Sequence, residues 1–327
     1  FYIFGIAELQ GMLPLIMEAK KKYNCWVCFF DSFTAKRQLY HYTDEEIFSL
    51  MPEINCDIYR SNDKNKFAKD YSIKKPQYIF IQTISPQYPT WLPSTNQSKV
   101  IHLAYYIESK HLKNPFTNIN LTIVNDEKYL NSYRTHKNVR YFGNYRLDNV
   151  NFVKEKEHPK RCFMVESWLR GSYLQNSILR PLADFYNNLF TFLKENNYEI
   201  VWKRREKGFP KEGWASPLDY CSIKPDLIID KDLMTPSSIF HYSVNSDLCL
   251  FIDDCFAFFD SVKINSNCFI LKSPLHPKRE YKFNEGWFNK YLDKILSYSN
   301  FKKLNIKPKI IQQHSFASKE IINYIKN

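Results

Sequence analysis

The sequence predicts an α/β protein of two domains, each built on a parallel β-sheet, and three observations support this. Short apolar runs typical of strands alternate with helical patterns through most of the chain, as they do in βαβ units. The 327 residues are too many for one ordinary hydrophobic core. Near residue 155 a charged stretch with a proline and few apolar residues interrupts the alternation.

The first domain is expected to span residues 1–152. Its strands are predicted near residues 1–7, 24–30, 55–59, 77–83, 99–106, 120–124 and 138–142. One helix is predicted between the first two strands and another over 125–134. A third helix is predicted to begin at Thr43, because Thr43-Asp44-Glu45-Glu46 has the form of a capping box ahead of an apolar run.

The second domain is expected over residues 153–300, with the charged stretch 153–161 as the linker into it. A long amphipathic helix is predicted over 177–196 and another helix from Pro236. Strands are predicted at 162–165, 198–203, 227–229, 247–252 and 267–271, and two amphipathic helices at 286–299 and 315–326. The last helix falls in a separate helical tail over 301–327. Two α/β layers of similar size are expected to face a central cleft.

The composition narrows the class of protein. Hydrophobic residues make up 44% of the chain, and the 7 glycines form neither a Walker P-loop nor a GxGxxG fingerprint. The formal net charge of +12 indicates either solubility alone or attraction to anions, such as nucleotide phosphates, phosphorylated glycans or an acidic membrane face. Nucleic acid is not expected as a partner, because no zinc knuckle, RNP-type strand or dense arginine cluster is present.

Cysteine usage and the lack of targeting signals predict a reducing, cytoplasmic location, with attachment to a membrane surface left open. The 8 cysteines form no disulfide-like framework, and neither a signal peptide nor an apolar run of about 18 residues is present. Cys25 and Cys28 form a CxxC, but residues three apart in a strand point to opposite faces, which favours core residues over a metal site. Because the chain starts inside a strand without a methionine, we expect it to be part of a longer protein.

Glu8 is the first candidate for chemistry. It lies at the exit of the first predicted strand, and ligands of open α/β sheets bind outside the carboxyl ends of the strands. A lone acid at this place is a candidate general base; the alternative is a solvated loop glutamate. At the end of the first domain, Gly143 and Asn144 are candidate hinge or cleft residues, since Gly143 suits a turn close to a ligand.

A basic run follows a predicted strand of the second domain and is the second candidate site. It comprises Lys203, Arg204 and Arg205, which directly follow an apolar stretch. At the carboxyl end of a strand these cations could hold a phosphate or diphosphate and neutralise a leaving group. The alternative is a solvated basic loop.

The start of a predicted helix is the third candidate. Thr235 suits the N-cap and Pro236 the first helical position. The hydroxyls of Ser237 and Ser238 and the following amides then form an anion site at the positive end of the helix, with His241 as a further donor-binding candidate. Helix capping alone also explains Thr235 and Pro236.

Acidic residues after another buried strand are the fourth candidate. Asp253 and Asp254 could cap a short helix, orient a ribose hydroxyl or position a basic side chain, and Asp260 lies within that helix. Two adjacent acids without further ligands are not a metal site, and no His/Asp cluster accompanies them.

At these residues the chain resembles the GT-B glycosyltransferase superfamily, in the branch of the Kdo transferases and the CDP-glycerol glycerophosphotransferase-like capsule enzymes. Gly5-Ile6-Ala7-Glu8 resembles the start of Kdo transferases, where a Gly-Glu precedes a helix and the glutamate acts as base. The segment Phe142–Asp148 is similar to the Gly-Asn-x-Lys-x-Asp that closes the first domain in these families. The segment Ser246–Asp260 is similar to the Ser-Asp…Asp-Tyr-Ser-Ser…Phe-Asp of the glycerophosphotransferases, and Trp202-Lys203-Arg204-Arg205 stands where those proteins carry Arg-Pro-His-Pro.

The resemblance implies two Rossmann-type domains that face a central cleft and carry out metal-independent glycosyl transfer. The first domain then binds a glycan or glycolipid acceptor near Glu8, and the second binds a nucleotide-sugar of cytidine or uridine type, for instance CMP-Kdo-like, in surface polysaccharide biosynthesis of the capsule or lipopolysaccharide kind. No cofactor besides this donor substrate is expected. Three alternatives stay open: a CDP-glycerol-type polyol-phosphate transferase, a non-hydrolysing UDP-sugar epimerase, and a non-catalytic glycan- or membrane-binding module.

Overall fold

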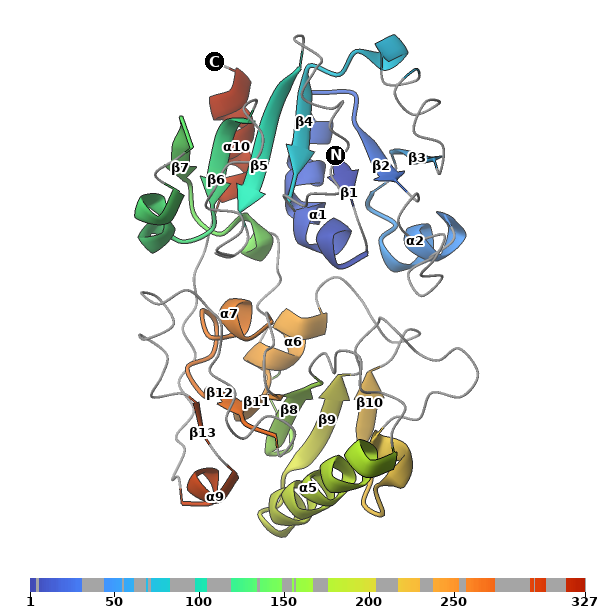
Figure 1. Ribbon diagram of the computed structural model, residues 1–327, viewed down its shortest axis with the longest axis vertical. Coiled ribbons are helices and arrows are strands. Elements are labelled where there is room, and N and C mark those ends of the chain that lie inside the picture. The colour runs from blue at the N-terminus through green and yellow to red at the C-terminus, as the bar shows by residue number, and fades with distance from the viewer. Residues whose placement is uncertain are drawn as a thin grey trace. The chain divides into compact units, whose positions relative to one another are not determined.

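A computed structural model gives the fold of the chain (Figure 1). It describes residues 1–3, 6–30, 44–54, 56–61, 69, 72–82, 98–104, 119–133, 136–148, 155, 157–166, 176–203, 217–229, 238–252, 257–273, 295–296, 298–303 and 316–326. The chain divides into two compact units. Unit 1 comprises Phe1–Asn149 and His314–Asn327, and unit 2 comprises Val150–Gln313.

Unit 1 is built on a seven-stranded sheet whose described strand pairs are all parallel, in the order β3-β2-β1-β4-β5-β6-β7. The strands are β1 (Tyr2–Ile3), β2 (Trp26–Phe30), β3 (Asp57–Ser61), β4 (Tyr78–Ile81), β5 (Lys99–Ala104), β6 (Ile119–Val124) and β7 (Val139–Tyr141). The helices are α1 (Ile6–Lys20), α2 (Asp44–Leu50) and α10 (Ala317–Lys326), with two 3-10 helices, η4 (Glu127–Tyr133) and η5 (Tyr145–Leu147).

The core of unit 1 depends on α1. Its buried residues recur at helical spacing and lie in one cluster with the sheet: Leu9, Met12, Leu15, Ile16 and Ala19. The same helix contains Gly11 and Pro14, the two residue types least favourable in a helix interior, by about 1 and 3 kcal/mol relative to alanine. Packing against the sheet, rather than helix propensity, therefore keeps α1 folded.

Unit 2 repeats this architecture with a six-stranded sheet in the order β10-β9-β8-β11-β12-β13, again parallel at every described pairing. The strands are β8 (Arg161–Val165), β9 (Glu199–Lys203), β10 (Leu227–Ile229), β11 (Leu248–Ile252), β12 (Cys268–Leu271) and β13 (Ile295–Leu296). The helices are α5 (Asn176–Glu195), α6 (Ser238–Val244), α7 (Ala257–Ser261) and α9 (Tyr298–Phe301), with the 3-10 helix η6 (Pro217–Tyr220). Trp202 of β9 is fully buried against Tyr186 and Phe190 of α5.

Most predicted elements are present near their expected positions, and four differ. The strand predicted over residues 1–7 is the shorter β1, Tyr2–Ile3, because Ile6 and Ala7 belong to the first turn of α1; residues 4–5 lie outside the described residues. The helix predicted over 125–134 is a 3-10 helix. Of the helix predicted over 286–299, residues 286–294 and 297 lie outside the described residues, and 298–299 are helical as the start of α9. Ile295–Leu296 form β13 instead, since pairing with Ile270 and Leu271 of β12 overrides local propensity. Arg161, expected in the linker, is the buried first residue of β8.

The C-terminal helix also differs from the expected separate tail, since it is part of unit 1. Helix α10 packs against α1 (Figure 1). Ala317, Ile321, Ile322 and Ile325 belong to the same buried cluster as the core residues of α1. The hydroxyl of Tyr78 on β4 donates to the carbonyl of Ile325 at 2.8 Å. The amphipathic pattern predicted the helix but contained nothing that specifies the surface it covers.

Within the described residues, none of the helices combines the length and the apolar character that crossing a bilayer requires. Cys28 lies buried in β2, as the apolar run predicted, and Cys25 precedes the strand and is half-buried. Burial raises the pKa of the Cys25 thiol, against the opposing charges of the N-terminal ammonium and Lys20.

We predict that Ile321→Ala lowers the free energy of unfolding of unit 1 by about 2–5 kcal/mol, because it leaves a cavity between α10 and α1. Lys319→Ala, on the exposed side of the same helix, is the matched control and should change it by less than about 0.5 kcal/mol. Urea denaturation measures the change in unfolding free energy for each variant, and hydrogen exchange of the α1 amides shows whether the change affects unit 1. Equal effects of the two variants would contradict the packing of α10 in this core.

Candidate functional site

The strand order of each unit indicates where along the carboxyl edge of its sheet, the edge at which the strands end, a ligand is expected to bind. In unit 1 the chain runs outward from β1 through β2 to β3 and then returns to the other side of β1 with β4. In unit 2 it runs from β8 through β9 to β10 and returns beside β8 with β11. Ligands of doubly wound sheets bind outside the carboxyl ends of the strands, at the point where the order reverses. This point lies between β1 and β4 in unit 1, and between β8 and β11 in unit 2.

Glu8 lies in unit 1 directly beyond the carboxyl end of β1. It is part of the first turn of α1, rather than the exit of a strand, and its side chain is partly buried. A carboxylate in the first turn of a helix is stabilised by the helix dipole, so local structure alone accommodates it. Its place at the reversal point also puts an acid where a substrate of this fold binds.

Gly143 and Asn144 lie in unit 1 after the carboxyl end of β7. Gly143 has φ = 106°, a left-handed conformation that favours glycine, so the predicted turn is present. Asn144 is buried and caps η5, since its side-chain oxygen accepts a hydrogen bond from the amide of Arg146 at 3.3 Å. The immediate role of Asn144 is therefore to fix the short helix that follows.

In unit 2, Lys203 ends β9 and is buried at the carboxyl edge of the sheet. Beside it, the amide of Glu166, the residue directly after β8, donates to the carbonyl of Lys203 at 3.1 Å. Glu166 is buried as well, and it is not among the residues predicted from the sequence. The sequence does contain a signal for Glu166, because this residue directly follows an apolar strand, and Glu8 was predicted on the same ground.

Ser238 and Asp260 lie on two short helices of unit 2 that pack against each other, α6 and α7. Both residues are almost fully buried. The helices are joined by a hydrogen bond of 2.8 Å from the hydroxyl of Ser243 to that of Ser261. The predicted candidates Arg204, Arg205, Ser237, Asp253 and Asp254 lie outside the described residues.

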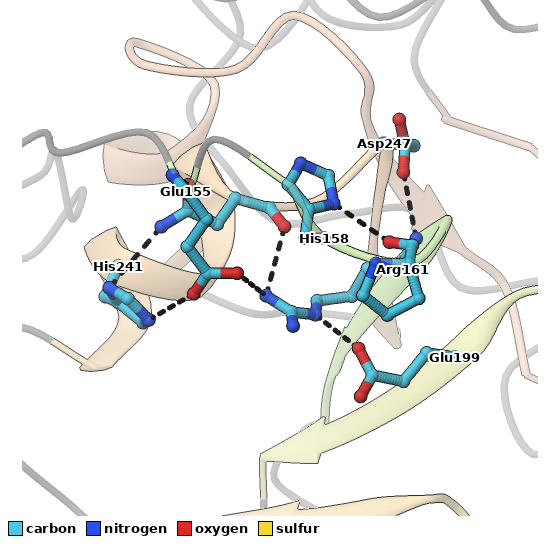
Figure 2. Close-up of polar contacts among 8 residues, drawn as sticks. Glu155, His158, Arg161, Glu199, His241 and Asp247 are labelled. Atoms are coloured by element: carbon cyan, nitrogen blue, oxygen red, sulfur yellow. Dashed lines mark hydrogen bonds and ion pairs between the residues drawn. The ribbon is translucent and has the colours of Figure 1, made fainter.

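His241, predicted to bind the donor, is engaged elsewhere in unit 2. Its Nε2 atom lies 3.2 Å from a carboxylate oxygen of Glu155, whose other oxygen lies 3.1 Å from Nη1 of Arg161 (Figure 2). Arg161 begins β8, so this cluster lies at the amino edge of the sheet, whereas Lys203 lies at the carboxyl edge. The structure does not bring His241 together with Lys203.

Arg161 is the centre of this amino-edge cluster. Its Nε atom donates to Glu199, the first residue of β9, at 2.6 Å, and its amide donates to Asp247 ahead of β11 at 2.9 Å (Figure 2). Burial disfavours the charged guanidinium, but the hydrogen bond and charge of Glu199, and then those of Glu155, outweigh it and raise the pKa of Arg161. The cluster joins β8 and β9 to the segment ahead of β11 and to the segment ahead of β8 that contains Glu155, which is a structural role.

A cavity of about 340 Å³ opens at the amino edge of unit 1, lined among others by Tyr23, Trp26, Lys74 and Tyr78. Trp26 and Tyr78 are the first residues of β2 and β4, so this cavity lies at the opposite edge of the sheet from Glu8. Among the described residues no group of three or more His, Cys, Asp or Glu side chains is arranged to hold a metal ion.

Comparison with solved structures identifies the fold. The chain is similar to the S. aureus MnaA–UDP co-structure, with 12% sequence identity over 99% of this chain and 94% of that one and a TM-score of 0.58. It is also similar to the glycotransferase of kitacinnamycin, with 11% identity over 88% and 82% of the two chains and a TM-score of 0.50. No family model and no curated protein sequence matches the chain. The predicted α/β fold, GT-B-like with two Rossmann-type domains, is thus confirmed.

We predict that Arg161→Met lowers the stability of unit 2 by about 2–3 kcal/mol, because it leaves the carboxylates of Glu155 and Glu199 without their charged donor. Arg180→Met, on the exposed side of α5, removes the same charge and should cost less than about 0.5 kcal/mol. Denaturant titration with hydrogen exchange of β8 and β9 measures the difference. If Arg161→Met leaves exchange in these strands unchanged, the cluster does not join them.

Proposed function

We propose that this protein is a glycosyltransferase that moves a sugar from a cytidine- or uridine-activated donor to a hydroxyl group of a glycan or glycolipid acceptor, with Glu8 as the general base. The observation that carries the proposal is the position of Glu8 at the reversal point of a doubly wound parallel sheet. The similarity of the chain to two solved structures supports the proposal, since one of them contains UDP and the other is named a glycotransferase.

The proposed reaction divides between the units. In unit 1, Glu8 takes the proton of the acceptor hydroxyl as its oxygen attacks the anomeric carbon of the donor sugar. The bond from that carbon to the phosphate oxygen breaks, and the nucleotide leaves with its negative charge. In unit 2, the ammonium group of Lys203 donates to the phosphate and stabilises that charge. Contributions of Arg204, Arg205, Ser237, Ser238, Asp253, Asp254 and Asp260 to donor binding stay predictions from the sequence.

His241 has no place in this proposal, because its imidazole contacts Glu155 at the amino edge of the sheet. The basic composition of the chain fits a substrate with phosphate groups. A role in surface polysaccharide biosynthesis and a CMP-Kdo-like donor are carried by the sequence resemblance alone, and an acidic membrane surface as partner is carried by the net charge of +12.

We expect cytidine or uridine nucleotides to raise the melting temperature of the protein, because a ligand that binds only the native state stabilises it by about 2.7 kcal/mol at 100 times its Kd. ADP serves as the comparison nucleotide. Lys203→Met should weaken binding of the preferred nucleotide roughly tenfold, the loss of one charge-assisted hydrogen bond. Lys160→Met, exposed at the opposite edge of the same sheet, should leave it unchanged. Equal affinities of the two variants would exclude Lys203 from the donor site.

We expect Glu8→Gln to lower turnover by roughly 100- to 10,000-fold, the usual contribution of a general base, while nucleotide affinity stays the same. Glu18→Gln on the same helix is the matched control and should retain full turnover. Transfer is measured by mass spectrometry of the acceptor product, with the preferred nucleotide as the guide to the donor. Near-normal turnover of folded Glu8→Gln removes Glu8 as the base.

A UDP-sugar epimerase is the second candidate, and it is favoured by the likeness to the MnaA–UDP co-structure, since that structure contains UDP. An epimerase converts its donor when no acceptor is present, whereas a transferase forms product only when the acceptor is added. Incubation of UDP-, CDP- and CMP-sugars with and without acceptor therefore separates the two functions. Epimerised donor in the acceptor-free sample would replace the glycosyltransferase proposal.

A further inference from the structure

Gly11 marks a close contact inside unit 1. It lies buried in α1, and a Cβ atom added there would lie 1.8 Å from Nη1 of Arg146 and 2.7 Å from its Cζ. Both distances are far below any ordinary contact of a Cβ atom. The guanidinium of Arg146 therefore lies directly on the backbone of α1, in space that every residue with a side chain would occupy.

The backbone that carries Arg146 is held from several directions. Asn144 caps η5 through the amide of Arg146. The neighbours Tyr145 and Leu147 are buried, and η5 packs against α1. Asp148 accepts a hydrogen bond from the amide of Ser318 at the start of α10 at 2.5 Å. The backbone of Arg146 is fixed in this way, and its guanidinium lies against Gly11, while the side chain as a whole stays partly exposed.

This position borders Glu8. Residues three apart on a helix lie on the same face, which applies to Glu8 and Gly11. Side chains of a helix lean toward its N-terminus, so the surface at Gly11 borders the turn that contains Glu8. Glu8 follows the carboxyl end of β1, and Arg146 follows that of β7 in the same parallel sheet. A carboxylate and a guanidinium therefore face the same edge of unit 1.

We propose that Arg146 binds an oxyanion, a carboxylate or a phosphate, on the acceptor, next to the hydroxyl that Glu8 deprotonates. This rests on the proposed function and names the class of its acceptor as one with an anionic group. The planar guanidinium donates two parallel hydrogen bonds to such a group, which a lysine cannot do.

The test uses two matched pairs of small probes and the whole chain without nucleotide. Glycerol 3-phosphate is compared with glycerol, and glucuronate with glucose, by NMR titration. The wild type should bind the anionic member of at least one pair roughly tenfold more tightly, the effect of one charged hydrogen-bonded contact. Preference in the first pair alone identifies a phosphate, in the second alone a carboxylate, and in both a general oxyanion site.

Three variants locate the preference. Arg146→Met should abolish the preference for the anionic probe. Arg146→Lys should retain only part of this preference, because lysine keeps the charge but cannot donate two parallel hydrogen bonds. Gly11→Ala should abolish it as well, since the added methyl group displaces the guanidinium while its charge remains. Arg140→Met, at an exposed residue of β7, removes the same charge from the same unit and should leave the preference intact.

Each outcome decides the proposal. If Arg146 only stabilises α1, its variants lower the melting temperature and leave the ratio of anionic to neutral binding unchanged, which overturns the proposal. A wild type without preference in either pair overturns it too. The nucleotide titration is independent of these measurements. If the protein prefers oxyanions through Arg146 but binds no nucleotide, the glycosyltransferase proposal is refuted and the oxyanion site is retained.

Discussion

In both units every described strand runs parallel to its neighbours, and this constraint decides where polar groups can gather. Parallel strands need crossover connections that cover the faces of the sheet, so only its two edges stay open to polar chemistry. All carboxyl ends then meet at one edge and all amino ends at the other. Glu8 and Lys203 follow from this rule at the carboxyl edges, and the Arg161 cluster at the amino edge of unit 2 follows from it as well.

The two edges of unit 2 use their charges differently. At the amino edge Arg161 finds carboxylates on both sides, and its hydrogen bonds join β8 to β9 and to the segment ahead of β11. Such groups neutralise one another and leave little for a ligand. At the carboxyl edge Lys203 and Glu166 are buried at the ends of adjacent strands, where this fold places its ligands. A charged residue therefore does not by itself indicate a binding site; it does so when it lies at the carboxyl edge of the sheet.

The sequence predicted the parallel architecture well because alternating apolar runs report burial directly. Leu227–Ile229 was placed at its exact bounds, and α5 within one residue at each end. Prediction failed where long-range contact decides the outcome. Ile295 and Leu296 pair with β12 and form a strand inside an apparently helical stretch. Ile6 and Ala7 were predicted to extend the first strand, although they belong to the first turn of α1.

The candidate site shows the same limit. The sequence predicts Glu8 and Lys203 as candidate site residues because each follows an apolar run, and the same argument applies to Glu166. Arg146 could not, because its significance lies in a contact with Gly11, 135 residues away in the chain. His241 was misplaced for a related reason: the sequence put it on the correct helix but could not show that Glu155 approaches it.

The return of the chain to unit 1 through α10 has a consequence for synthesis in the cell. Unit 1 leaves its core open until the residues after Phe316 have emerged from the ribosome, since α10 supplies part of that core. Unit 2 is complete earlier, because its last segment ends at Gln313. Domains fold as units while translation continues, so the domain in the middle of the chain can reach its native state before the one that contains the N-terminus. During that interval the part of α1 that α10 covers in the native state stays exposed to solvent.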